Sequence, residues 1–156
     1  MSLSHPGVPK FRSTYTNDPR NVALARNAIA SFARLNGFDD DAAAEIKLAA
    51  GEALSNASEY GRSTRGGGFS VSCTFDDGEL RIEIQDSGPG FDVPADKRAI
   101  APDHRDRGFG IFVMRRLMDS VTFARHGTRV ELVRRAILGR TDGTPRLERQ
   151  AYHDPR

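Results

Sequence analysis

The spacing of hydrophobic residues along the chain predicts strands and helices in alternating groups. Apolar residues alternate with polar ones in short segments, which is the pattern of strands with one buried face. In longer segments they recur every three or four residues, which is the pattern of helices that bury one side. The predicted strands cover residues 11–16, 69–75, 80–86, 121–123 and 129–133. The predicted helices cover residues 19–35, the residues after Asp39–Asp41 up to Gly61, and a segment from the Gly108 and Gly110 pair to Leu117, with Phe109, Phe112 or Val113, and Leu117 on its apolar side.

Cap and turn residues mark the ends of these elements. Asp18 followed by Pro19 is typical of a helix start, because the carboxylate accepts from free N–H groups and Pro at the first position loses no hydrogen bond. Gly37 stands where a left-handed cap ends the first helix. The pairs Asp77-Gly78 and His126-Gly127 predict tight turns, each of which joins two strands into a hairpin.

Strands joined mainly in hairpins and separated by helices predict an α/β protein, an α+β sandwich of two layers. We expect a mixed, mainly antiparallel sheet that three helices cover on one face. The folded domain is expected at residues 11–138, after a loose N-terminus at 1–10 and before a disordered basic tail at 139–156. Residues 92–107 have no apolar period, and a structureless segment of that length in a small domain predicts a functional lid.

Composition and charge narrow the classes of function. The 156 residues suit one globular domain, and no apolar run approaches the roughly 18 residues of a membrane span. The N-terminus does not read as a signal peptide, and the single Cys73 excludes an internal disulfide, so we expect a cytoplasmic protein. The pI is near 9.0. Six arginines from Arg134 onward face only three acidic residues, whereas the rest of the chain is nearly neutral, so we expect no nucleic-acid binding.

The first candidate site residues are Glu52 and Asn56, which the second predicted helix carries four positions apart and therefore on one face. An Asn carbonyl oxygen is a ligand that Mg²⁺ accepts, and a Glu can orient water or accept a proton. Small residues such as Ala53 and Ala57 surround the pair and leave room for a ligand. The alternative is an exposed hydrophilic pair without a function.

A second candidate is Asp86, which ends an apolar strand just before Gly88 and Gly90. A carboxylate there can accept a hydrogen bond from an exocyclic amine, and the two glycines let a flat ring approach the backbone. A capped turn without a ligand is the alternative. Thr128, after the second hairpin turn, is either a turn residue or a contact to the same ring.

A third candidate is the sequence Gly108-Phe109-Gly110 at the start of the last helix, where free N–H groups and the helix dipole favour an anion. It lacks the Walker A pattern and the spacing of a Rossmann fingerprint, so a phosphate site here is of another type. The alternative is a flexible loop joined to a helix. Asp119, near the end of this helix, is expected to be a structural or capping group.

Taken together and in order, these motifs resemble the N, G1, G2 and terminal boxes of the GHKL ATPase superfamily. The resemblance covers about residues 11–135, and within the superfamily the chain looks like the small bacterial anti-sigma-factor serine kinases of the RsbW/SpoIIAB type. The matching segments are Glu52-x-x-x-Asn56-Ala57, Asp86-x-Gly88-x-Gly90-Phe91, Gly108-x-Gly110 with Arg115-Arg116-Leu117-Met118-Asp119, and Gly127-Thr128. Ser58-Glu59-Tyr60 and Phe112 depart from the usual residues of these kinases.

The resemblance implies a Bergerat ATP site in which Asn56 binds Mg²⁺, Glu52 is the general base, Asp86 bonds the adenine amine and residues 92–107 form the ATP lid. The cofactors implied are ATP and Mg²⁺. The nucleotide-binding residues implied are Asn56, Asp86, Gly88, Gly90, Phe91, Arg107, Gly108, Phe109, Gly110, Ile111 and Thr128.

The resemblance also implies a cytoplasmic homodimer that holds a sigma factor inactive and phosphorylates a serine of an antagonist protein, without contact to nucleic acid or membrane. The surface of the first helix, with Arg20 and Arg26, is a candidate client face. Two alternatives stay open. One is an ATP-gated binding module without kinase activity. The other is the catalytic half of a split histidine kinase, since all four histidines fall in predicted turns or tails.

Overall fold

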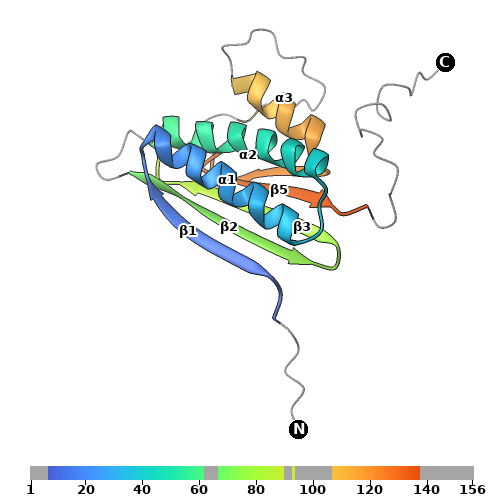
Figure 1. Cartoon of the computed structure of the whole chain (residues 1–156). Helices are drawn as coiled ribbons and strands as arrows, with labels where there is room; N and C mark the ends of the chain where they lie inside the picture. The colour runs from blue at the N-terminus through green and yellow to red at the C-terminus, as the bar shows by residue number, and fades with distance from the viewer. Residues whose placement is uncertain (1–6, 62–66, 90–92, 94–106, 138–156) are drawn as a thin grey trace, which may run out of the picture.

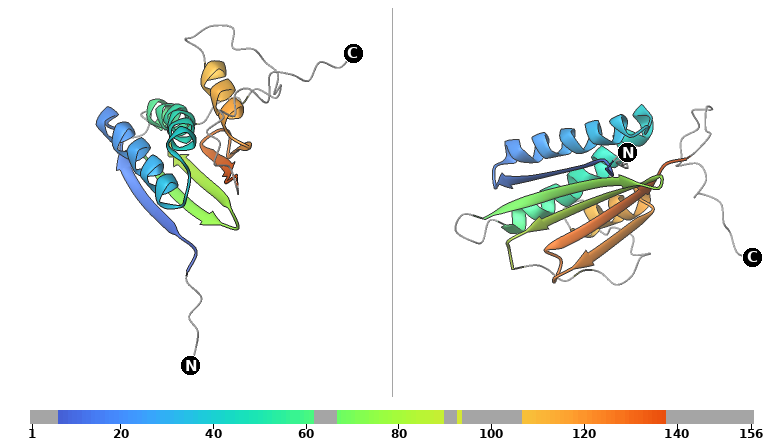
Figure 2. Two further views of the ribbon diagram at one scale, coloured as in Figure 1. Left: turned by 45° about the vertical axis from the view of Figure 1, so that its right-hand side comes forward. Right: turned by 90° about the horizontal axis from the view of Figure 1, so that it is seen from below.

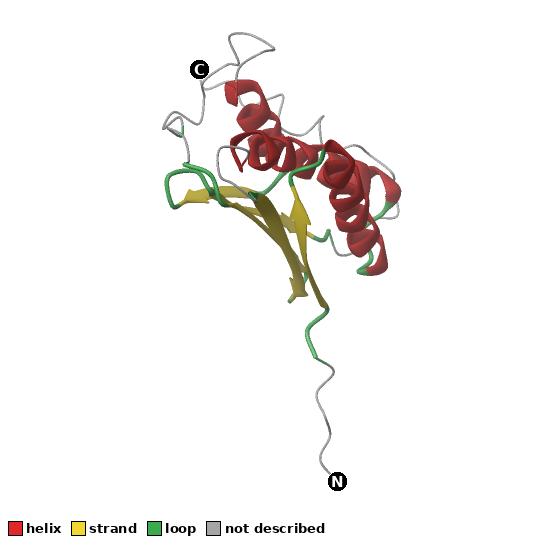
Figure 3. Ribbon diagram, turned by 90° about the vertical axis from the view of Figure 1, so that its left-hand side faces the viewer, coloured by secondary structure: helices red, strands yellow, loops and turns green. Residues whose placement is uncertain are grey.

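Three helices cover one face of a five-stranded sheet in the computed structural model, so the protein has two layers (Figure 1, Figure 3). The structure describes residues 7–61, 67–89, 93 and 107–137. This arrangement confirms the predicted fold class. The elements are β1 (Lys10–Thr16), α1 (Pro19–Leu35), α2 (Asp40–Gly61), β2 (Gly68–Asp76), β3 (Glu79–Asp86), α3 (Arg107–Leu117), β4 (Ser120–Ala124) and β5 (Arg129–Arg135).

The strands lie in the order β1-β2-β3-β5-β4, and every neighbouring pair is antiparallel. A mixed, mainly antiparallel sheet was expected, but the described strands include no parallel pair. The reason is the path after β3. The chain passes through α3 into β4 at the sheet edge, and the hairpin from β4 then returns β5 beside β3 in the opposite direction.

The two faces of the sheet differ as the alternation predicts. Residues that point toward the helices, such as Val71, Ile82 and Leu132, are fully buried in one core with the inner sides of α1, α2 and α3. The right-hand view of Figure 2 is turned toward the other face of the sheet. Charged pairs lie on that face. Arg81 pairs there with Glu131 across the strands. One face of the sheet therefore holds the molecule together and the other is solvated.

The boundaries of α1 and the first hairpin agree with the sequence analysis. The Asp18 carboxylate accepts from the backbone N–H of Arg20 at 2.9 Å, Pro19 opens the helix, and Gly37 has a positive φ of 91° just after it. The side-chain hydrogen bond from Arg20 lowers the pKa of Asp18 to about 2. Asp77 and Gly78 both have positive φ in the turn between β2 and β3.

Helix α3 largely agrees with its prediction. It begins at Arg107, one residue before the predicted start, so Gly108, Phe109 and Gly110 lie in its first turn. Its buried side consists of Ile111, Met114, Leu117 and the following Met118. Of the two alternatives expected on the apolar side, Val113 packs against the core, whereas Phe112 is 40% exposed. Bulky apolar residues at mixed spacing fit two helical faces, and the contact with α2 decides between them.

Several sequence predictions fall outside the described residues. These are most of the loose N-terminus, the lid apart from Val93 and Arg107, and the basic tail. In the part of the chain that is described, no helix is long and apolar enough to cross a membrane. Cys73 is buried in the core, and burial raises the pKa of its thiol to about 12, so the thiol stays protonated.

Candidate functional site

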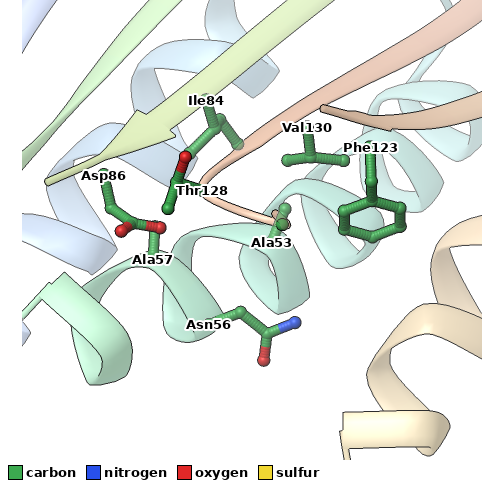
Figure 4. A pocket seen from close by; sticks show the side chains of 9 residues that line it. Ala53, Asn56, Ala57, Ile84, Asp86, Phe123, Thr128 and Val130 are labelled. Carbon is green, nitrogen blue, oxygen red and sulfur yellow. The ribbon is translucent and has the colours of Figure 1, made fainter. Parts of the chain in front are cut away.

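A small cavity lies where α2 passes under the end of β3. Figure 4 shows Asp86 at the end of β3, Asn56 on α2 and Phe123 from β4 around this space. The cavity measures about 10 Å³, the room of a single water molecule. Its full lining is Ala53, Asn56, Ala57, Ile84, Asp86, Phe123, Gly127, Thr128 and Val130. Of the predicted site residues, Asn56, Asp86 and Thr128 therefore come together here.

Asp86 is a half-buried carboxylate held by backbone hydrogen bonds. Its own N–H donates to the Thr128 carbonyl oxygen at 2.8 Å, and its Oδ1 accepts from the N–H of Gly88 at 2.7 Å. Burial raises the pKa of Asp86 above its ordinary value, and the hydrogen bond from Gly88 opposes this shift. Since a carboxylate has about four acceptor positions, Asp86 keeps capacity for a donor from a ligand.

Asn56 carries a buried polar atom without a partner. Its Nδ2 makes no hydrogen bond within the part of the chain that the structure describes. An unsatisfied buried donor costs about 1–3 kcal/mol, so this amide suits a polar ligand that fills the neighbouring space. Rotation of the amide by half a turn presents its oxygen in the same position. Asn56 can therefore serve either as a donor to a ligand or as an oxygen ligand to a cation.

Glu52 lies one helical turn before Asn56 and touches the first turn of α3. A Cβ built on Gly110 would stand only 2.9 Å from Oε2 of Glu52 and 3.6 Å from its Cβ. Gly110 is itself buried, so the absence of its side chain lets α3 approach the carboxylate. The fold thus brings Glu52 and Gly110, 58 positions apart, into direct contact.

The first turn of α3 supplies backbone donors at this contact. The N–H groups of the residues Arg107 to Phe109 have no intrahelical acceptor, because the donors of the first three residues of a helix lack one. They also lie at the positive end of the helix dipole. Together with Glu52 and Asn56 on the neighbouring side of α2, they make an end of the molecule suited to an anion with a bound cation.

The remaining predicted residues have mixed positions. Ile111 is 1% exposed and belongs to the core, so only its backbone faces any ligand. Thr128 donates from Oγ1 to the Arg125 carbonyl oxygen at 2.8 Å, a turn role, although it also lines the cavity. Gly90 and Phe91 lie outside the described residues.

Asp119 is the structural group that was expected, since its Oδ2 accepts from the backbone N–H of Arg135 at 2.8 Å. On the expected client face, Arg20 is exposed and paired with Asp18 at 2.7 Å. Arg26, in contrast, lies across α2, with its Cδ 3.1 Å from the Cβ position of Gly51 and its Nε buried. The charge of Arg26 is therefore less accessible to a client protein than that of Arg20.

The sequence analysis missed two kinds of site residue. Ile84, Phe123 and Val130 form the apolar walls of the cavity, and alternation along their strands already places them on the inner face. Arg134 was counted only among the surplus of arginines near the C-terminus, but it is buried and paired with Glu45 on α2. The alternation along β5 could have predicted its burial, because Arg134 lies two residues after Leu132 and therefore on the same inner face.

The side chains fit a magnesium ion only in company with a phosphate ligand. No group of three or more His, Cys, Asp or Glu residues able to hold a metal occurs within the described ranges. Mg²⁺ commonly takes few protein ligands and completes its shell with phosphate oxygens and water. The buried amide of Asn56 on α2 and the N–H groups in the first turn of α3 together meet this requirement.

Comparison of the sequence with known proteins gives independent information about the family of the chain. Residues 15–134 match the histidine kinase-like ATPase domain. The serine-protein kinase RsbW of Oceanobacillus iheyensis is 29% identical over 112 residues, covering 66% of this chain and 71% of that protein. The anti-sigma F factor of Clostridium acetobutylicum is 31% identical over 123 residues, covering 72% and 81%. That of Clostridium botulinum is 30% identical over 131 residues, covering 79% and 92%.

Proposed function

Because this chain belongs to the family of histidine kinase-like ATPase domains, we propose that it binds ATP and Mg²⁺ between α2, the end of β3 and the first turn of α3. The observation that carries this proposal is the buried amide of Asn56, which has no partner in the described structure and lies beside the Asp86 cavity. Most buried polar side-chain atoms in proteins have a hydrogen-bond partner. Among the unpartnered ones in the described residues, which also include atoms of Asn17 and Arg26, only that of Asn56 belongs to a residue lining the cavity.

The adenine end of the nucleotide belongs at Asp86. The carboxylate accepts from the exocyclic amine, while Ile84 and Val130 contact the faces of the ring. The cavity of about 10 Å³ is far smaller than a purine. Binding therefore requires the lining to open, and Phe123 and Thr128, which come from the sheet edge and its turn, are the side chains best placed to move.

The triphosphate belongs at the start of α3. The N–H groups of Gly108 and Phe109 donate to its oxygens, Gly110 lines the same place, and Asn56 approaches from α2. When bound, Mg²⁺ neutralises phosphate charge and fixes the geometry of the γ-phosphate. Gly90, Phe91 and Arg107 complete the proposed set of nucleotide contacts, and residues 92–107 are the proposed lid.

The enzymatic activity that we propose is that of a serine-protein kinase, because several relatives are serine-protein kinases by name. Glu52 lies within reach of a group bound against Gly110. In the proposed step it accepts the proton of a serine hydroxyl while the serine oxygen bonds to the γ-phosphorus and the bond from that phosphorus to ADP breaks. Phosphoryl transfer needs mainly positioning and charge neutralisation, which this site supplies.

The proposed partners follow from the anti-sigma F factors among the relatives. We propose that the protein sequesters a sigma factor, phosphorylates an antagonist protein that competes for it, acts as a homodimer and works in the cytoplasm. An ATP-gated binding module is the alternative, but binding alone needs no base at Glu52. The catalytic half of a split histidine kinase is a further alternative.

The substitution Glu52→Gln tests the kinase activity. Radiolabelled γ-phosphate transfer to candidate antagonist proteins should fall by about 10²-fold or more, because the amide cannot accept the proton. ATP affinity, measured by calorimetry, should stay within about threefold. Glu59→Gln, on the exposed side of the same helix, is the matched control and should leave both unchanged. Equal transfer by Glu52→Gln and the unaltered protein would contradict the assignment.

A further inference from the structure

A buried arginine fastens the end of α3 that is opposite to the proposed phosphate site. Arg134 of β5 is 3% exposed. Its Nη1 donates to the Leu117 carbonyl oxygen in the last turn of α3, and its Nη2 pairs with Oε2 of Glu45 at 2.6 Å. One guanidinium thus joins β5, α2 and α3. We call this group of Arg134, Glu45 and the Leu117 carbonyl the arginine clasp.

Physical chemistry gives the clasp a geometric role. A buried ion pair contributes little net stability, because desolvation of both charges offsets their attraction. What a guanidinium adds is a rigid planar fork whose donors have fixed directions. Here Nη1 of Arg134 contacts the negative C-terminal end of α3, and Nη2 contacts the Glu45 side chain of α2. The clasp therefore sets where α3 lies along α2.

The clasp and the proposed site share the same pair of helices. Glu45 and Glu52 are seven residues apart on α2, and Gly110 and Leu117 are seven residues apart on α3. At about 1.5 Å per residue both separations are roughly 10 Å. Glu45 is linked to Leu117 through Arg134, and Glu52 touches Gly110, so the helices run antiparallel with matched contacts at both ends. A shift of α3 at the clasp must move Gly110 relative to Glu52.

We propose that Arg134 is a positioning residue for phosphate binding: it holds α3 so that the N–H groups of its first turn and Glu52 meet the triphosphate together. This inference rests on the proposed function of the site. Asp86 lies at the end of β3 and its recorded hydrogen bonds go to Gly88 and Thr128, outside the clasp. Loss of the clasp should therefore weaken contacts to phosphate and spare contacts to adenine.

The experiment compares two ligands in matched variants of the full chain. Affinity for ATP with Mg²⁺ is measured by calorimetry and affinity for AMP by NMR titration. The variants are Arg134→Met and the double substitution Glu45→Met with Arg134→Met. The double variant removes both buried charges and so keeps the fold stable even if the single variant leaves Glu45 unpaired and unfolds. Arg135→Met, which alters the exposed neighbour paired with Glu79, is the control.

We expect the Kd for ATP to rise about tenfold in the folded clasp variants, the Kd for AMP to change less than twofold, and the control to match the unaltered protein. Proportional weakening of both ligands, or unchanged affinity for both, would overturn the positioning role. If the unaltered protein binds AMP and ATP equally well, the clasp has no phosphate contact to position and the inference fails. If it binds neither, the proposed function fails as well.

Discussion

At the scale of single residues, Asp86 shows a conflict between stability and binding. Burial raises the pKa of its carboxyl, which means that the folded protein disfavours the charged form. The cost of ionisation is present at pH values above the folded-state pKa and disappears as the pH falls through it. The charged Asp86 carboxylate destabilises the free protein, so folding does not explain its presence. A hydrogen bond from a ligand donor explains it better. The Asn56 amide, unpaired within the described residues, carries a similar cost.

The substitution Asp86→Asn separates these two effects. ATP affinity should fall by about 1–3 kcal/mol, because the amide presents a donor where the purine amine needs an acceptor. The free protein should not lose stability at pH 7, because the substitution removes a charge that burial disfavours. Calorimetry and thermal unfolding measure the two quantities.

The pH dependence provides the control for this variant. In the unaltered protein, ATP affinity should decline as the pH falls through the raised pKa of Asp86, at a higher pH than its ordinary value of 3.8. The Asn variant should lack this step, and subtracting its profile removes the titration of ATP itself. Identical profiles, or a variant with full affinity, would count against the adenine contact.

The residues of the site were largely predictable from local patterns, whereas their contacts were not. The spacing of Glu52 and Asn56 fixes a shared helical face, and the apolar strand that Asp86 ends fixes its place at the end of β3, the central strand of the sheet. The contact of Glu52 with Gly110 depends on how two helices pack, which no local spacing encodes. The same holds for Arg134, whose burial follows from the register of β5 and not from its charge.

At the scale of elements, the packing of α3 on α2 determines the chemistry of the site. The two helices meet where Gly110 has no side chain, and the Glu52 carboxylate occupies the space that a Cβ would need. Glu52 can rotate away from such a Cβ, because only the far end of a flexible side chain is in conflict. A change at Gly110 should therefore displace the proposed base without unfolding the protein.

The substitution Gly110→Ala tests this coupling between the helices. Phosphate transfer should fall by on the order of 10²-fold, the cost of misplacing a catalytic group by about 1 Å. Stability should stay within about 1 kcal/mol of the unaltered protein, because the helix propensity of Ala compensates for the contact. Gly51→Ala on α2 is the matched control, since its new Cβ meets only the flexible Arg26 side chain at 3.1 Å. Full transfer activity in Gly110→Ala would refute the contact as a functional one.

The elements themselves followed from the sequence with small errors at their ends. The cap at Asp18 and the turns at Asp77-Gly78 and His126-Gly127 have local causes, and the structure places each where it was expected. Two glycines normally weaken a helix, yet α3 contains both in its first turn. Here the close approach of α2 favours a residue without a side chain at Gly110, so tertiary packing overrides helix propensity.

At the scale of the whole molecule, the candidate site lies on the side of the sheet that the helices cover. The uncovered face of the described strands carries paired charges, such as Arg129 with Glu83. The layer order was predictable from alternation, but the purely antiparallel pairing was not, because it depends on β4 taking the sheet edge before β5 returns. The small cavity at Asp86 also could not be predicted from the sequence, because it depends on side-chain packing across four elements.

The most direct test of the account is an NMR titration of the uniformly ¹⁵N-labelled protein with ATP and Mg²⁺. The account predicts saturable amide shifts at α2 around Glu52 and Asn56, at Asp86 and Gly88, at Gly108–Ile111 and at Thr128, with small changes on β1 and the uncovered sheet face. An absence of shifts, or shifts confined to the uncovered face, would contradict a nucleotide site between α2, β3 and α3.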